Sequence, residues 1–247
     1  MLLLNKVALV TGAGRGIGAS VAQTFGREGA TVAVHFNSSA TAAREIADAA
    51  GQDSEAFQAD LSDASSTRAM VDSVIRRYGR IDVLVNNAST FEHHTTIETS
   101  KWEDFAREFT GVVGTTLNPI QAVLPHMKTA GKGKIVNFIA SLIERPAPEY
   151  VVHATAKSAL VGLSRSIAKE YGPFGITANM VSPGMTLTDF TVALPEMARE
   201  GVRLQTPVRR LATPQDVANI VLFYACDLSD MLTGSMLTPD GGLVDCH

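Results

Sequence analysis

The stretch EYVVHATAKSALVGLSRSIAKEYG, at 149–172, carries the side chains in this sequence that are best suited to proton transfer. Its apolar spacing predicts an amphipathic helix, and residues four apart on a helix share a face. His153 and Lys157 are four apart, so both should point into the same space. A histidine side chain changes its charge near neutral pH, which suits it to act as a general acid or base. The pair therefore indicates an active site, a degraded active site, or a helix surface that carries two basic residues.

A second motif, VTGAGRGIG, has the spacing of a phosphate-binding loop. It follows a short β-branched run and opens a helical pattern in which Ile17, Val21 and Phe25 recur every four residues. Glycine permits a tight turn there and lets backbone N–H groups approach a pyrophosphate, whose charge the helix N-terminus favours. The sequence therefore predicts a dinucleotide site that uses Gly12, Arg15, Gly16, Ile17 and Gly18.

The choice between NADP and NAD depends on the end of the second predicted strand. An acidic residue there binds the ribose 2′-OH of NAD and repels the 2′-phosphate of NADP. This sequence has HFNSS at 35–39, with no carboxylate, so Asn37, Ser38 and Arg15 could meet a phosphate instead. The sequence therefore favours NADP(H), with NAD(H) as the alternative.

Strand and helix patterns alternate along the chain in a βαβ rhythm. Longer helical patterns separate seven predicted strands, which cover 6–12, 30–36, 55–61, 81–88, 133–141, 175–184 and 235–242. This alternation predicts an α/β fold of the Rossmann type, with a doubly wound, parallel, seven-stranded sheet and helices on both faces. No linker or repeat interrupts the chain, so we interpret residues 1–247 as a single domain.

Ligands of such sheets bind at the carboxyl ends of the strands. Polar residues gather at those ends, at Gly12–Gly18, Asp60, Asn86–Ser89, Ser141 and Pro183–Thr188. We therefore expect a cofactor cleft at this edge of the sheet. The segment that follows the sixth strand, at 185–205, should be the most mobile one.

The bulk composition narrows the class of protein further. A net charge of −4 and the lack of a basic stripe argue against a nucleic-acid partner. Cys226 and Cys246 have neither metal-ligand nor disulfide spacing, in agreement with a reducing cytoplasm. His93 and His94 either line the cleft or belong to a polar loop, and no third ligand at metal spacing accompanies them. Because no apolar run could span a bilayer or serve as a signal peptide, we expect a cytoplasmic protein with no metal and no membrane partner.

Together these motifs resemble the short-chain dehydrogenase/reductase family over nearly the whole chain. TGAGRGIG resembles its cofactor loop, NNAS at 86–89 its NNAG element, and SPGMTLT at 182–188 its PG element. RRLATPQDVANIVLFYACD and TGSMLTPDGG resemble its C-terminal segment. The resemblance implies further cofactor contacts at Asp60, Leu61, Asn87, Ala88, Ser89, Lys157, Pro183, Gly184 and Thr188. It also implies reduction of a ketone or a β-ketoacyl thioester, as in 3-oxoacyl-ACP reductases, by a homotetramer or a dimer.

The chemistry of this family uses a tyrosine, a lysine four residues later, a serine and an asparagine. By resemblance, Ser141 takes the place of the serine that bonds the substrate oxygen, and Lys157 that of the lysine that holds the ribose. His153 stands where the tyrosine is expected. The asparagine position falls on Val112, and Asn118 lies six residues further on. The resemblance therefore implies an atypical active site.

Three interpretations of this site remain open. In the one that we prefer, His153 replaces the tyrosine as the general acid of an NADP(H)-dependent oxidoreductase, which transfers a hydride between nicotinamide and a ketone or alcohol. In the second, Tyr150, three residues earlier on the same face, supplies the proton directly or through His153. In the third, the protein keeps its cofactor but acts as a partner, a regulator or a non-redox catalyst, since a fold does not guarantee a function.

Overall fold

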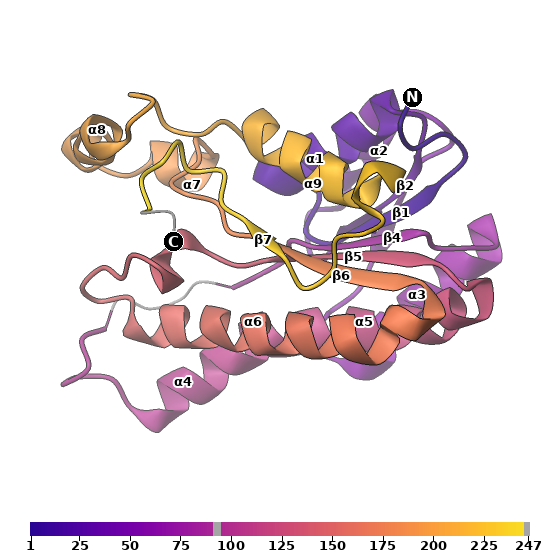
Figure 1. The fold of residues 1–247 in the computed structure, drawn as a ribbon, viewed down its shortest axis with the longest axis horizontal. Helices are drawn as coiled ribbons and strands as arrows, with labels where there is room; N and C mark the ends of the chain where they lie inside the picture. Colours follow the sequence, from indigo (N-terminus) through magenta and orange to yellow (C-terminus); the bar gives the residue numbers. More distant parts are fainter. Residues whose placement is uncertain (91–94, 245–247) are drawn as a thin grey trace.

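The computed structural model describes residues 1–90 and 95–244 and contains a parallel seven-stranded sheet (Figure 1). The strand order is β3-β2-β1-β4-β5-β6-β7, and all neighbouring strands are parallel. The strands are β1 Val7–Val10, β2 Thr31–Phe36, β3 Glu55–Gln58, β4 Val83–Asn86, β5 Gly133–Phe138, β6 Ile176–Val181 and β7 Met236–Leu237. The predicted doubly wound α/β sheet is confirmed, and its strand order reverses between β1 and β4.

Helices cover both faces of the sheet (Figure 1). α1, α2 and α9 pack on one face, whereas α3, α5 and α6 pack on the other. α4 continues through a short π-helical segment into α5. The α-helices are α1 Gly16–Arg27, α2 Ala40–Ala50, α3 Ala64–Tyr78, α4 Trp102–Phe109, α5 Thr115–Ala130, α6 Val151–Tyr171, α7 Asp189–Val192, α8 Glu196–Gln205 and α9 Pro214–Ala225. Short 3-10 turns are formed by Ser141–Ile143, Gly172–Phe174 and Asp227–Ser229.

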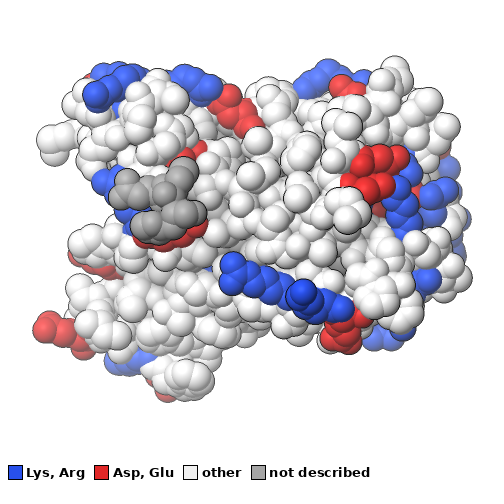
Figure 2. All heavy atoms as spheres, in the orientation of Figure 1, with Lys and Arg blue, Asp and Glu red and all other residues white. Residues whose placement is uncertain are grey.

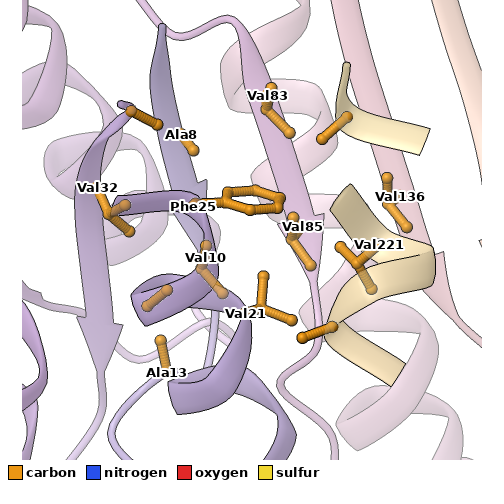
Figure 3. Close-up of a cluster of buried hydrophobic side chains, with 14 of the residues drawn as sticks. Ala8, Val10, Ala13, Val21, Phe25, Val32, Val83, Val85, Val136 and Val221 are labelled. Atoms are coloured by element: carbon orange, nitrogen blue, oxygen red, sulfur yellow. The ribbon is translucent and has the colours of Figure 1, made fainter. Parts of the chain in front are cut away.

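Alternate side chains of each strand enter different cores, as the two-residue period of a strand requires. Val10 and Val85 belong to the core beneath α1 and α9, around Phe25 (Figure 3). Their neighbours Leu9 and Leu84 belong to the opposite core, beneath α3, α5 and α6. Since β1 and β4 are buried on both faces, their sequences are continuous apolar runs rather than alternating ones.

The helical stretch from α4 to α5, part of which packs against α6, is irregular. α4 leads into the π-helical segment Thr110–Gly114, and α5 contains Pro119. A proline removes one N–H from the helical ladder, and π-helical turns occur frequently at functional sites. Gly111 lets this turn approach the loop after β4, because a Cβ there would lie 1.8 Å from Thr90 Oγ1. The π-helical turn is thus fitted closely against the carboxyl edge of the sheet.

The chain after β6 forms the two short helices α7 and α8. Several apolar side chains there are exposed, including Phe190 and Met197. An isolated bridge between Thr186 and Ala212 ties the start of this segment to the chain before α9. The mobility expected for 185–205 stays a prediction.

On the face drawn in Figure 2, basic and acidic side chains are mixed and some adjoin one another, within a surface that is mostly uncharged. No continuous basic stripe of the kind that binds nucleic acid crosses the described residues of that face. Within residues 1–90 and 95–244, no helix is both long and apolar enough to cross a membrane.

Candidate active site

The carboxyl ends of β1 and β4 are joined by hydrogen bonds where the strand order reverses. Thr11 Oγ1 accepts from the backbone N–H groups of Asn87 and Ala88, each at 3.0 Å. Asn87 Nδ2 donates to the carbonyl oxygens of Thr11 and Gly12, at 3.0 and 3.1 Å. The structure thus brings together the glycine loop and the loop after β4, at the edge where ligands of doubly wound sheets bind.

Three glycines of the first loop occupy positions that suit glycine. Gly18 has no room for a side chain, because a Cβ there would lie 2.6 Å from both Gly12 O and Asn87 Nδ2. Gly12 and Gly16 have φ of +61° and +57°, in the left-handed region that glycine adopts without strain. A Cβ on Gly16 would lie 3.5 Å from Thr188 Cγ2, so the loop also borders the segment after β6.

His35, at the end of β2, links the glycine loop to the chain after β3. Its Nδ1 accepts from the Gly12 N–H at 3.0 Å, and its Nε2 lies 3.1 Å from Ala59 O. Because a carbonyl can only accept, the ring is the neutral tautomer with its proton on Nε2. Burial lowers the pKa of His35, and the bond to Ala59 partly opposes that effect. Sequence reasoning missed this residue, since a buried histidine in a strand has no pattern of its own.

The residues predicted to meet a 2′-phosphate lie at the surface. Arg15, Asn37 and Ser38 are exposed. Arg15 immediately precedes α1, at a helix N-terminus, where negative charge is favoured. Asn37 O accepts from Gln58 Nε2 at 2.9 Å, which ties the turn after β2 to β3. One guanidinium and two short polar side chains are therefore exposed at the ends of adjacent loops.

Asp60 and Leu61 follow β3 and differ in exposure. The Asp60 carboxylate is exposed and accepts from the Ser62 hydroxyl and N–H at 2.7 and 2.9 Å, and these bonds lower the pKa of Asp60. Leu61 is buried, and its carbonyl accepts from Asn118 Nδ2 at 2.7 Å. Asn118 is therefore held against the chain after β3.

The ends of β5 and β6 bring Ser141 next to the segment after β6. The Ser141 N–H donates to Pro183 O at 3.2 Å. Gly184 packs closely against Asp240, whose Cβ would lie 2.8 Å from an added Cβ. Ser89, in the loop after β4, is exposed and donates its hydroxyl to the backbone of the next residue at 3.1 Å.

Lys157 is a buried cation at the same edge of the sheet. Its Nζ donates at 3.0 Å to the carbonyl of Phe138, the last residue of β5, and the residue is 5% exposed. Burial lowers the pKa of Lys157 to about 8, and the charge of Glu108 partly offsets that effect. Since an ammonium has three donors, Lys157 has hydrogen-bonding capacity beyond the bond to Phe138.

His153 lies one turn before Lys157 and contacts a carboxylate that the sequence analysis did not identify. Its Nδ1 lies 2.5 Å from Glu108 Oε1, and the two residues are 8% and 4% exposed. Glu108 is in the last turn of α4, three residues after the half-buried Phe105. The sequence signal that could have identified Glu108 was a glutamate on the inward face of that helix, because a buried carboxylate needs a partner.

Tyr150 and Val112, two positions that the sequence singled out, lie in different environments. Tyr150 immediately precedes α6, and burial and the charge of Glu149 raise the pKa of its phenol. Its hydroxyl is therefore a weaker acid than that of an exposed tyrosine. Val112 is buried in an apolar cluster with Ile139 and Leu160. The position predicted for the asparagine thus presents no polar side chain.

Two further expectations concern metal binding and thiols. His93, His94 and Cys246 lie outside the described residues. Among the residues that are described, no group of three or more His, Cys, Asp and Glu side chains could hold a metal ion. Cys226 is a buried, free thiol.

Known proteins resemble this chain over nearly its whole length. A family model described as "Enoyl-(Acyl carrier protein) reductase" matches residues 12–244. The 3-oxoacyl-[acyl-carrier-protein] reductase FabG of Staphylococcus aureus is 34% identical over 249 residues, covering 97% of this chain and 98% of the relative. An uncharacterized oxidoreductase of Methylorubrum extorquens is 37% identical and covers 98% of both chains. The structure of a short-chain dehydrogenase/reductase mutant from Serratia marcescens matches with a TM-score of 0.91 at 32% identity, covering 98% of this chain and 99% of that one.

The fold and these matches define an oxidoreductase of the doubly wound α/β class. The matches cover almost every described element, and the relatives include 3-oxoacyl-[acyl-carrier-protein] reductases. The chain therefore belongs to the short-chain dehydrogenase/reductase family, as its motifs indicated.

Proposed function

We propose that this protein is an NADP(H)-dependent ketoreductase, which transfers a hydride between nicotinamide and a ketone or alcohol. The observation that carries the proposal is the pair His153 and Lys157, one turn apart on α6. The Lys157 ammonium contacts the end of β5, and the glycine loop follows the end of β1. Both features lie at the carboxyl edge of one sheet. An ammonium and a proton-exchanging ring on one helix face are suited to stabilising an alkoxide as it forms.

The residues around the first loop fit a dinucleotide. Gly16 and Gly18 have no side chains in the first turn of α1, so a pyrophosphate can approach the backbone N–H groups there. Arg15 and Ile17 complete this loop. Further contacts to adenine, ribose and nicotinamide are assigned to Asp60, Leu61, Asn87, Ala88, Ser89, Lys157, Pro183, Gly184 and Thr188. When bound, the nicotinamide supplies or accepts the hydride.

The preference for NADP(H) over NAD(H) is proposed from the end of β2. No acidic side chain stands at 35–39 to repel a 2′-phosphate. The exposed Arg15, Asn37 and Ser38 supply one positive charge and several hydrogen-bond donors for that phosphate. Arg15 carries most of the preference, because it is the charged group of the three.

Three side chains act on the substrate and ribose in this proposal. The Ser141 hydroxyl donates to the carbonyl oxygen, and His153 gives that oxygen a proton as negative charge develops on it. In the oxidative direction the same ring takes the proton back. Lys157 donates to the ribose hydroxyls and keeps a positive charge beside the reacting oxygen.

A carbonyl or acyl thioester is the proposed substrate class. The named Staphylococcus aureus relative is a 3-oxoacyl-[acyl-carrier-protein] reductase, which supports a β-ketoacyl thioester in particular. We also propose that residues 1–247 form one domain and that the protein acts in the cytoplasm as a homotetramer or dimer. No nucleic-acid, membrane or metal partner is part of the proposal.

Two measurements on the purified protein test this function. NADPH and NADH are first titrated by nicotinamide fluorescence, and we expect binding at micromolar NADPH and weaker binding of NADH. NADPH oxidation is then followed with a panel of ketones and β-ketoacyl thioesters, of which at least one should be reduced. If neither cofactor binds below millimolar concentration, the proposal is wrong.

A second candidate function is a cofactor-binding protein without redox activity, which acts as a partner, a regulator or a non-redox catalyst. The apolar environment of Val112 favours it, because a proton-relay asparagine has no equivalent there. A wild type that binds NADPH but reduces no carbonyl, together with a reductase created by His153→Tyr, would establish this alternative. An active wild type would exclude it.

A further inference from the structure

Glu108 is a buried carboxylate in a helix whose other acidic residues are more exposed. Glu103 is exposed, and Asp104 accepts from the Lys101 N–H at the start of α4. Burial of a carboxylate costs several kcal/mol unless hydrogen bonds and opposite charge compensate it. The bond of 2.5 Å to His153 Nδ1 provides that compensation. The pair therefore joins α4 to α6 through groups that can exchange a proton.

The charge of Glu108 also reaches Lys157. Burial lowers the pKa of this lysine, and the charge of Glu108 partly opposes that effect. The described contacts thus place two ionisable groups near His153, one from α4 and one from the next turn of α6. A bond that only anchored α4 would need neither the titratable ring nor this position beside Lys157.

We propose that Glu108 is a positioning residue for His153, an inference that rests on the proposed ketoreductase function. The carboxylate keeps the proton of the ring on Nδ1 and so leaves Nε2 as the nitrogen that serves the substrate. It also stabilises the imidazolium from which that proton is given, as a carboxylate does in other carboxylate–histidine pairs. An imidazole that replaces a phenol thereby gains the orientation and charge that it lacks alone.

In the reductive direction, the carbonyl group gains one hydride and one proton. The carbonyl carbon gains a hydride from the reduced nicotinamide, and the π electrons of the C=O bond move to oxygen. The Nε2–H bond of the His153 imidazolium breaks, and an O–H bond forms on the product alcohol. The neutral ring keeps its Nδ1–H on Glu108, and solvent returns a proton to Nε2. The ketone is reduced by two electrons and the nicotinamide is oxidised by two.

Kinetics of Glu108 variants test the role in turnover. Glu108→Gln keeps the size of the side chain and removes its charge, so we expect kcat to fall about 100-fold with NADPH Kd and KM within about twofold. The acidic limb of the kcat–pH profile should also move. Glu108→Asp keeps the charge and should recover part of the loss. Glu103→Gln, on the exposed side of the same helix, is the matched control and should retain wild-type kcat.

Two kinetic results would overturn the positioning role. The first is a Glu108→Gln enzyme with wild-type kcat and an unchanged pH profile. The second is a loss of NADPH binding in proportion to the loss of kcat in both Glu108→Gln and Glu108→Asp, since a structural anchor would act on both.

A measurement that needs no turnover separates this inference from the proposed function. Long-range ¹H–¹⁵N spectra of protein with ¹⁵N-labelled histidine report which ring nitrogen carries the proton, and His153→Gln identifies the signals of His153. We expect a proton on Nδ1 in the wild type, and a ring protonated mainly on Nε2 in Glu108→Ala. The same tautomer in both would overturn the inference. A tautomer that changes, in a wild type that reduces no carbonyl, would instead refute the ketoreductase function and leave the role of Glu108 in orienting the ring intact.

Discussion

Two regions lie at the same end of the sheet but are built in different ways. The glycine-loop edge comprises Gly12–Gly18 and the loop after β4, and the His153 cluster comprises Glu108, His153 and Lys157. At the glycine loop, four hydrogen bonds each pair a backbone group with the side chain of Thr11 or Asn87. At the His153 cluster, the bond between His153 and Glu108 joins side chains from separate helices, and Lys157 donates to a strand carbonyl. The first region depends on a close approach of backbone segments, and the second on a bond between two ionisable side chains.

The two regions should therefore respond differently to substitution. The glycine loop should tolerate few replacements of Gly18, because no Cβ fits there. A side-chain cluster keeps its shape when one member changes, provided that a new partner compensates the change. Glu108 is that partner for His153 in our account. Variants of each region should therefore fail in distinct ways.

The largest effect is expected at the glycine loop. Gly18→Ala should lower the free energy of unfolding by about 3 kcal/mol, the upper end of the range for overpacking, because its Cβ would meet backbone and side-chain atoms at 2.6 Å. Gly162, within α6, is the matched control, since a Cβ there meets nothing within 4 Å. Gly162→Ala should stabilise the protein by about 0.5–1 kcal/mol. Urea denaturation measures both, and equal effects would contradict the close approach at Gly18.

The lowered pKa of the buried Lys157 should make the free energy of unfolding depend on pH. The unfolded lysine binds a proton up to its ordinary pKa of 10.5, whereas the folded one loses it above a pKa of about 8. The unfolded state therefore binds more protons between these values, and the wild type gains about 3 kcal/mol of stability as pH rises through this window. Lys157→Met should lack that gain. Parallel stability curves for the two proteins between pH 7 and 11 would contradict a buried ammonium.

Removal of the same ammonium should weaken cofactor binding. Lys157→Ala is expected to raise the Kd for NADPH about 100-fold, because hydrogen bonds from a charged donor to the ribose are lost. Lys169→Ala, at an exposed position near the end of α6, should leave the Kd unchanged. Fluorescence titration measures both. An unchanged Kd in Lys157→Ala would remove this residue from the cofactor site.

The smallest effect is expected at the surface of the cofactor site. Arg15→Ala should weaken NADPH binding about tenfold and NADH binding by less than about twofold, since only NADPH carries the 2′-phosphate that we propose the guanidinium binds. The NADPH effect should also shrink at high salt, because Arg15 is exposed. Equal losses for the two cofactors would place Arg15 at the pyrophosphate instead.

The features that backbone geometry determines could be predicted from the sequence. The seven strands and the turn at Gly12 could be predicted because periodicity, glycine and strand order are local or topological properties. His35 and Glu108 were missed because each acquires its role from a partner far along the chain. Glu108 and His153 are 45 residues apart, and no local pattern joins them.

Residue positions in the helical stretch from α4 to α5 were difficult to predict from the sequence for a related reason. A π-helical turn contains an extra residue, so the register of the face changes within Thr110–Gly114. An alignment that counts residues backward from α5 therefore assigns residues in and before this turn to the wrong helix face. Asn118, the polar candidate in α5, contacts the carbonyl of Leu61. The catalytic roles of Ser141, His153 and Lys157 stay predictions, because they depend on a substrate and a cofactor.

The central claim is that His153 transfers the proton in an active ketoreductase. The most direct test is kcat of the wild type and of His153→Ala, measured at saturating NADPH with the best carbonyl substrate of the panel. We predict that the wild type is active and that kcat falls about 100-fold in the variant, while the Kd for NADPH changes less than about twofold. Equal kcat values would contradict the account and direct attention to Tyr150 as the proton donor.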